Sequence, residues 1–127
     1  MLRDALLKFT RELTSTLTIQ SVTASTITVN GEPYRHAIAL TTEEVLANWE
    51  PKPIAELSDS DFETLLGSSP EIILLGTGGK NVFPPRELMF SFARRGIGFE
   101  CMDTAAAART FNVLAAEGRQ IAAVFYL

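Results

Sequence analysis

Cysteine, histidine and long apolar runs are scarce in this chain. Its 127 residues include one cysteine, Cys101, and one histidine, His36, which excludes an internal disulfide and a cysteine-based zinc site. No apolar run approaches the roughly 20 residues that cross a bilayer, so we expect no transmembrane segment. The start, MLRDALLKFTREL, lacks the long apolar core of a secretory signal. A lone thiol is typical of a reducing compartment, and we expect a cytoplasmic protein.

Positive charge is also limited. The net charge is −4, and the basic residues are scattered, with the densest pair at Arg94–Arg95. Non-specific nucleic-acid binding needs clustered Lys and Arg, so no nucleic-acid partner is expected. The carboxylates are dispersed and histidine is rare, so we assign no catalytic residue and no metal ligand, and we expect no cofactor. A hydrophobic content of 46% predicts one compact domain.

The hydrophobic pattern divides the chain. Residues 1–16 are interpreted as an N-terminal arm, a short helix or a strand, and residues 17–127 as a single domain. From Leu17 to Leu40 apolar and polar residues alternate, which predicts an antiparallel meander. Asn30–Gly31 is a strong hairpin signal, and YRHAIAL is interpreted as the partner strand.

The second half is more regular. Three apolar strands are predicted, at EIILL, IGFECM and RQIAAVFYL, and two helices between them, at PPRELMFSFARRG and DTAAAARTFNVLAAEG. Helical crossovers imply parallel neighbouring strands. The predicted fold class is α/β. We expect one mixed sheet with an antiparallel N-terminal hairpin region and a parallel C-terminal half, and helices packed on it.

The stretch GTGGK after the first apolar strand looks like a phosphate loop. The dinucleotide fingerprint fails because Asn81 replaces its third glycine, and a Walker A loop fails because Asn81 also replaces the hydroxyl residue. Pro84 and Pro85 have no N–H, so a helix that opened with them would lose anion-binding donors. Classical nucleotide binding is therefore disfavoured, which leaves a small anion nest or a simple turn.

Polar side chains follow the next strand. Asp103 and Thr104 stand where an acidic residue meets a ribose in doubly wound sheets, but Asp103 is also a suitable helix cap. Arg109 and Asn112 share a helix face, either as a solvated pair or as a binding surface. A Cys101–His36 catalytic pair is disfavoured, because both residues are expected within strands.

Several blocks together carry a family resemblance. They are Gly76-Thr77-Gly78, Met102-Asp103-Thr104, Arg109-Thr110-Phe111-Asn112 and Glu117-Gly118-Arg119. With the hairpin ITVNGEPYRHAIAL, they resemble the Mth938-like domain family, which includes the mitochondrial complex I assembly factor three. The resemblance implies a compact α/β domain of uncharacterised function, with no catalytic activity securely attached and with relatives that act through protein contacts. The chain shows no recognisable mitochondrial presequence, so we expect a protein of bacterial type.

Two hypotheses follow. The first is a non-enzymatic protein-interaction or assembly-factor-like domain that supports assembly of a membrane or respiratory complex. Its partners would be proteins of unknown identity, and its contact surface would be the Gly76–Phe83 loop and the start of the Thr104 helix. The residues singled out for this surface are Gly76, Thr77, Gly78, Gly79, Asp103, Thr104, Arg109 and Asn112. The alternative is a small-molecule or anion-binding domain, or a weak enzyme, with its site at the Gly76–Gly79 loop and Asp103. A deep pocket that holds Arg109 would favour the alternative.

Overall fold

A small antiparallel sheet forms the N-terminal part of the fold. The computed structural model describes residues 16–46 and 48–127, so the predicted arm over residues 1–16 lies, except for Thr16, outside the described residues. The small sheet has the order β1-β2-β3, with β1 at Ile19–Val22, β2 at Ile27–Val29 and β3 at Glu32–Tyr34. Asn30 and Gly31 link β2 to β3 with φ of 48° and 86°, which confirms the predicted hairpin turn.

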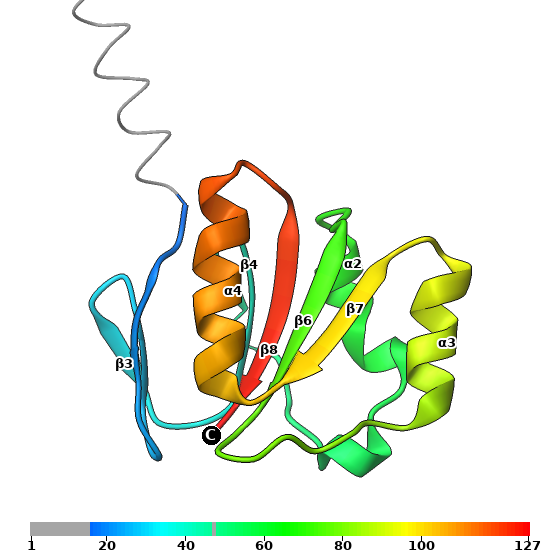
Figure 1. The fold of residues 1–127 in the computed structure, drawn as a ribbon, viewed down its shortest axis with the longest axis horizontal. Helices are drawn as coiled ribbons and strands as arrows, with labels where there is room; N and C mark the ends of the chain where they lie inside the picture. The colour runs from blue at the N-terminus through cyan, green and yellow to red at the C-terminus, as the bar shows by residue number, and fades with distance from the viewer. Residues whose placement is uncertain (1–15, 47) are drawn as a thin grey trace, which may run out of the picture.

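A five-stranded mixed sheet lies at the centre of the domain (Figure 1). Its order is β5-β4-β8-β6-β7, with β5 at Val45–Leu46, β4 at Ile38–Thr41, β8 at Ile121–Tyr126, β6 at Ile72–Thr77 and β7 at Gly98–Met102. β6 pairs in parallel with both β7 and β8, while β4 is antiparallel to β8 and to β5. The predicted α/β class, with a parallel C-terminal half in a mixed sheet, is confirmed.

The predicted meander is wrong at its last strand. YRHAIAL does not continue the small sheet, because β3 ends at Tyr34 and β4 crosses to pair with β8 in the main sheet. The reason is burial on both faces: Ile38 and Leu40 point into one hydrophobic cluster, and Ala39 points into the other. A strand buried on both sides belongs inside a sheet that is covered on both faces.

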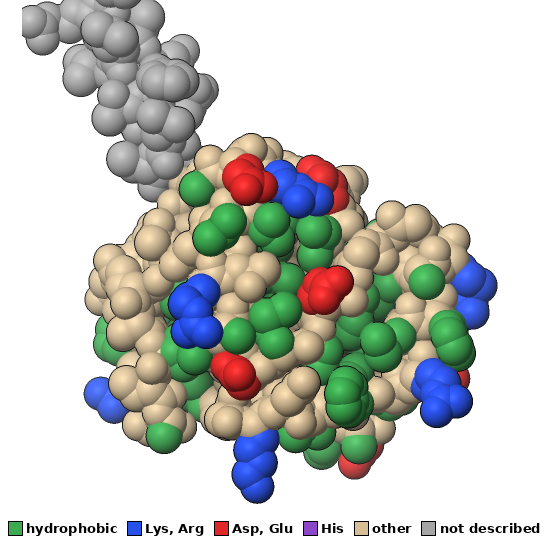
Figure 2. Space-filling model, viewed as in Figure 1, with side chains coloured by type: hydrophobic (Ala, Val, Ile, Leu, Met, Phe, Trp, Pro, Cys, Tyr) green, Lys and Arg blue, Asp and Glu red, His purple; other side chains and the backbone are tan. Residues whose placement is uncertain are grey.

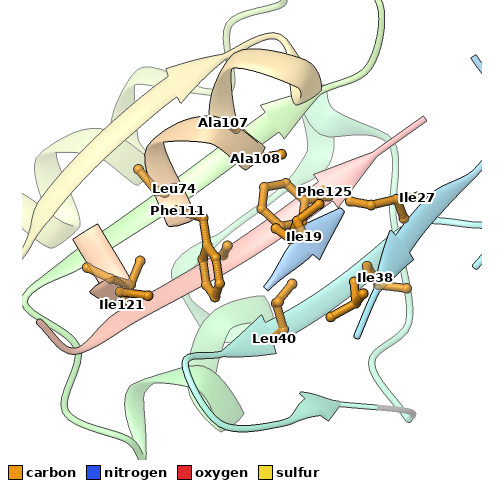
Figure 3. Close-up of a cluster of buried hydrophobic side chains, with 13 residues drawn as sticks. Ile19, Ile27, Ile38, Leu40, Leu74, Ala107, Ala108, Phe111, Ile121 and Phe125 are labelled. Carbon is orange, nitrogen blue, oxygen red and sulfur yellow. The ribbon is translucent and has the colours of Figure 1, made fainter. Parts of the chain in front are cut away.

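Helices and the small sheet cover the two faces of the main sheet. One face carries the 3-10 helices η1 (Ile54–Glu56) and η2 (Asp59–Phe62) with the helices α2 (Glu63–Leu66) and α3 (Arg86–Arg94). The other face carries α4 (Thr104–Ala116) and the small sheet (Figure 1). Along β6, Leu74 points into the α4 side and Ile73 and Leu75 into the α3 side, which explains the continuous apolar run. Figure 3 shows the cluster between α4, the main sheet and the small sheet.

Local signals in the sequence form the expected caps. The Asp103 carboxylate accepts a 2.9 Å hydrogen bond from the Ala106 N–H, and α4 ends before Gly118, which has φ of 80°. Pro84 and Pro85 precede α3 rather than opening it, since the helix begins at Arg86. The condition under which the prolines would remove its first donors is therefore not met, and Pro85 occupies the N-cap position.

The turn around η2 is held by one carboxylate. Asp61 accepts a 2.9 Å hydrogen bond from the Ser58 N–H and lies 2.9 Å from the Lys52 ammonium. Burial raises the pKa of Asp61, but the Ser58 hydrogen bond and the Lys52 charge lower it more, so its pKa lies below the ordinary aspartate value. Ser58 is the N-cap residue of η2.

Candidate functional site

The glycine turn and the Asp103–Thr104 segment meet at the carboxyl ends of β6 and β7. Because these strands are parallel neighbours, Gly76 lies beside Met102, and the chain then enters α4 across the end of β6. A methyl group at Gly76 would lie 2.9 Å from Thr104 Oγ1 and 3.0 Å from Thr104 Cα. Gly76 is therefore required for the close approach of the first turn of α4 to the sheet.

Thr104 connects three segments through its buried side chain. Its hydroxyl donates to the Tyr126 carbonyl oxygen at 2.5 Å and accepts from the Gly78 N–H at 2.7 Å. Its own N–H donates to the Gly78 carbonyl oxygen at 2.9 Å. The start of α4 is thus tied to the glycine turn and to the end of β8, and Thr104 has no free donor for a ligand.

The Thr77 side chain fixes the loop that follows the glycine turn. Its hydroxyl donates to the Lys80 carbonyl oxygen at 2.5 Å and accepts from the Val82 N–H at 3.2 Å. Gly78, with φ of 90°, turns the chain away from β6. Gly76, Thr77 and Gly78 are all buried, whereas Gly79 is exposed. The glycine turn therefore acts mainly as structure, and only its last residue reaches solvent.

A hollow of about 300 Å³ lies at these strand ends, lined by residues of four segments: Val22, Thr23, Ala24, Gly78, Gly79, Asp103, Thr104, Ala105, Tyr126 and Leu127. It contains four of the predicted site residues. The Tyr126 hydroxyl points to the Lys52 carbonyl oxygen at 2.6 Å, and burial raises the pKa of Tyr126 to about 12, so the phenol is protonated at neutral pH. The Asp103 carboxylate places negative charge at the same place, which opposes an anionic ligand.

Arg109 and Asn112 lie away from this hollow. The Asn112 side chain bonds to β1 in both directions: its amide nitrogen donates to the Ile19 carbonyl oxygen at 2.8 Å, and its oxygen accepts from the Ile19 N–H at 2.9 Å. Arg109 is exposed beside β1 and lines a separate shallow hollow. The structure thus brings Gly76–Gly79, Asp103 and Thr104 together but places Arg109 and Asn112 elsewhere.

Exposed apolar side chains lie in a region that the predicted contact surface included only as far as Phe83; Met89 and Phe90 on α3 were not singled out. Among the described residues, four of the five exposed large hydrophobic side chains belong to residues 82–90: Val82, Phe83, Met89 and Phe90. We call these four the apolar surface; Phe83 is 72% exposed and Phe90 54%. Figure 2 shows hydrophobic side chains reaching the surface beside α3 and over β7. The signal was present in the pair Val82–Phe83, two large apolar residues in a polar loop.

The thiol and the imidazole have separate neighbours. Cys101 Sγ donates to the Val82 carbonyl oxygen at 3.2 Å, and burial raises the pKa of the thiol, so it is protonated at neutral pH. His36 is exposed and its Nδ1 lies 3.0 Å from the Ala37 carbonyl oxygen. Within residues 16–46 and 48–127, no three His, Cys, Asp or Glu side chains cluster as metal ligands, and no helix has the length and apolar character of a membrane span.

These features define a single α/β domain in which a mixed sheet is covered by helices on one face and by a helix and a small antiparallel sheet on the other. Residues 19–126 match the model of a family of proteins of unknown function, DUF498/DUF598, and the chain belongs to this family. A crystal structure of a Bordetella parapertussis protein has a TM-score of 0.80 at 34% identity, over 88% of this chain and 96% of the other. A Bordetella pertussis protein described as a Mth938-like domain has a TM-score of 0.71 at 28% identity, over 86% and 84%. The Mth938-like resemblance is confirmed.

Named proteins from a bacterium and a mammal are among the curated relatives. A 13 kDa major membrane protein of Francisella tularensis subsp. holarctica is 32% identical over 93 residues, which are 72% of this chain and 75% of the relative. Assembly factor 3 of the NADH dehydrogenase [ubiquinone] 1 alpha subcomplex from Rattus norvegicus is 30% identical over 103 residues, which are 80% of this chain and 55% of the relative. The chain therefore spans little more than half the length of that assembly factor.

Proposed function

We propose that this chain is a protein-interaction domain of assembly-factor type, which binds a protein partner through the apolar surface next to the glycine turn. The observation that carries the proposal is the exposure of Val82, Phe83, Met89 and Phe90 within nine consecutive residues. Clustered exposed apolar side chains are typical of interaction sites, and aromatic residues are enriched among interface anchors. The distant relationship to an assembly factor supports the same function.

The rigid support of this region favours a binding role. Thr77 holds the loop through Lys80 and Val82, and Cys101 holds it through the Val82 carbonyl oxygen. Phe83 is therefore displayed from a loop that is fastened to the ends of β6 and β7. Preorganised side chains lose little conformational entropy on binding, which raises affinity. By this proposal the partner belongs to a membrane or respiratory complex under assembly, as the name of the mammalian relative suggests.

Affinity capture from the native cell, with mass spectrometry of bound proteins, tests the proposal. The variant Phe83→Ser/Phe90→Ser removes two exposed aromatic rings, and Val113→Ser is the matched control because Val113 is 58% exposed but lies on α4. We expect the double variant to lose specific partners and the control to keep them. Substitution of Gly78, with its φ of 90°, would strain the fold and is not a suitable probe.

Two outcomes contradict the proposal. One is an identical set of captured proteins for wild type, double variant and control. The other is loss of the partners in Val113→Ser as well. The Tm values of wild type, the double variant and the control should agree within about 2 °C, because substitutions at exposed positions change stability little.

A second candidate function is small-molecule binding in the hollow at the strand ends, and it has weaker structural support than the protein-interaction function. Its volume of about 300 Å³ is at the lower end for ligand pockets. The Gly78 N–H is already bonded to Thr104, and Asp103 caps α4. Titration with inorganic phosphate, followed by NMR shifts of the Gly79 and Ala105 amides, tests it. We expect no saturable shift, and a saturable shift at both amides would favour the second candidate. Cytoplasmic location and the absence of nucleic-acid binding stay predictions.

A further inference from the structure

The edge strands of the two sheets differ in the features that block pairing with a further strand. In the small sheet, β3 contains Pro33, which offers no donor, and the free edge of β1 is covered by the Asn112 side chain through both backbone groups of Ile19. In the main sheet, the edge strand β5 has only two residues. Short strands, prolines and covering groups are the usual ways of blocking an edge. Among the described residues, β7 alone is a longer edge strand without any of these devices.

The outward backbone groups of β7 can be identified from its pairing. The Gly98 N–H donates to the Glu71 carbonyl oxygen at 2.9 Å, so Gly98 faces β6, and Glu100 and Met102 face it by alternation. The N–H and C=O groups of Phe99 and Cys101 therefore point away from β6. Within residues 16–46 and 48–127 no other segment pairs with this edge, and the β6–β7 register is regular over five residues.

Apolar side chains lie beside this open edge. On α3, Leu88 and Phe92 face the sheet, and the Ser91 hydroxyl donates to Asp59 of η2 at 2.7 Å. At 100° per residue, Met89 lies about 160° around the helix from Ser91, on the flank opposite η2. The Val82 carbonyl oxygen accepts a hydrogen bond from Cys101 Sγ, so the loop that contains Val82 and Phe83 lies on the α3 side of the sheet, near the carboxyl end of β7. A strand added to β7 would thus lie between Met89 and the Val82–Phe83 loop.

Charge decides which partner suits this edge. Glu100, at the centre of β7, is exposed on the α4 side and forms no ion pair with any described residue. A second copy in full antiparallel pairing would place Glu100 opposite Glu100, which is unfavourable. A strand with lysine or arginine at that position is favourable. Its residues on the α3 side should be apolar.

We propose that β7 binds an extended segment of a partner protein as a sixth strand, with a basic side chain beside Glu100 and apolar side chains toward Met89 and Val82. The inference rests on the proposed protein-interaction function and adds its binding mode, strand addition. Backbone pairing to Phe99 and Cys101 would supply affinity, and the alternating side chains would supply specificity.

A pair of synthetic peptides tests this mode. The probes are a capped heptapeptide of alternating lysine and valine and its glutamate–valine counterpart, titrated into the full chain and followed by NMR and amide hydrogen exchange. Cys101→Pro removes an outward N–H and obstructs the edge, while the inward bonds of Gly98, Glu100 and Met102 remain. Cys101→Val is the matched control, since it also lacks the thiol but keeps the N–H.

The expected results are specific to the edge. The lysine peptide should bind wild type and Cys101→Val equally, and in both proteins it should slow exchange of the backbone amides at positions 99 and 101. It should bind Cys101→Pro about tenfold more weakly. Glu100→Lys should reverse the preference between the two peptides. This charge reversal needs no change in the backbone, so it tests the inference independently of any effect of proline on folding.

Other results overturn the inference. Three of them concern the lysine peptide: equal binding to Cys101→Pro and Cys101→Val, slowed amide exchange at positions away from β7, or no binding to wild type. The fourth is self-association of wild type that Cys101→Pro abolishes, which would identify a second copy of the chain as the occupant. Loss of the native partner in Phe83→Ser/Phe90→Ser but not in Cys101→Pro would refute strand addition and leave the proposed function intact.

Discussion

Adding one methyl group at Gly76 should destabilise the whole domain. The added carbon of Gly76→Ala would lie 2.9 Å from Phe125 Cδ1, 2.9 Å from Thr104 Oγ1 and 3.0 Å from Thr104 Cα. Real side chains essentially never approach this closely, so at least one neighbour must move. Phe125 is fully buried, and Thr104 is held by two hydrogen bonds of its hydroxyl, so neither can move without cost.

The size of the effect follows from two opposing contributions. Overpacking of a well-packed core costs about 1–3 kcal/mol, and contact with the backbone atom Thr104 Cα places this site at the upper end, about 3 kcal/mol. Replacing glycine by alanine reduces the conformational entropy of the unfolded chain, which returns about 0.4–1 kcal/mol. The net expectation for Gly76→Ala is a loss of about 2 kcal/mol, or about 8 °C in Tm at about 4 °C per kcal/mol.

Urea denaturation of Gly76→Ala and Gly79→Ala checks this reasoning. Gly79 is the matched control, because a methyl group there meets no atom within 4 Å and its φ is not positive. We expect Gly79→Ala to equal or slightly exceed wild type, and the denaturant dependence of all three proteins to agree. If the free energy of unfolding of Gly76→Ala lies within about 0.5 kcal/mol of the wild-type value, Gly76 is not required for packing. The structural role assigned to the glycine turn is then refuted.

Three further substitutions test other contacts. Thr104→Val leaves the buried Gly78 N–H without its acceptor and should cost about 2–3 kcal/mol in urea denaturation; a loss below about 1 kcal/mol would contradict the role of this hydroxyl. Asn112→Leu should cost about 1–3 kcal/mol and accelerate exchange of the Ile19 amide, and unchanged exchange would show that the side chain does not hold β1. The pKa of Asp61 is lowered in the folded protein, so its ionised carboxylate stabilises the fold at pH values above the ordinary aspartate pKa of about 3.9. This stabilisation is lost as the pH falls through the lower pKa of the folded state. Asp61→Asn should therefore lower the free energy of unfolding at neutral pH and flatten its fall as the pH drops below about 4, and parallel stability curves for both proteins would refute the linkage.

The order of strands and helices in the second half was predictable because each signal is local. The apolar run of β6, the Asp103 cap and Gly118 after α4 each depend on neighbours in the sequence. The hairpin at Asn30–Gly31 is of the same kind, since positive φ is a property of the turn itself. The family blocks around the glycine turn also pointed to the correct fold.

The candidate site was predicted only in part. Parallel pairing of β6 and β7 brings Gly76–Gly79 and Asp103 together, as the topology implied. Most of these groups, however, bond to one another rather than facing solvent. Phe90 was interpreted simply as part of a helix, because its exposure depends on which face of α3 meets the sheet.

The sequence by itself determined the order of strands and helices in the second half of the chain and the hairpin turn at Asn30–Gly31, since backbone preferences, caps and side-chain periodicity act over a few residues. Only the tertiary structure decided that β4 joins the main sheet, that Asn112 bonds to Ile19, 93 residues away, and that β7 remains an open edge beside Phe83. The physical reason is that burial on two faces, close approach at a glycine and the pairing of a strand edge are properties of segments that meet in space. No local pattern records which segments those are.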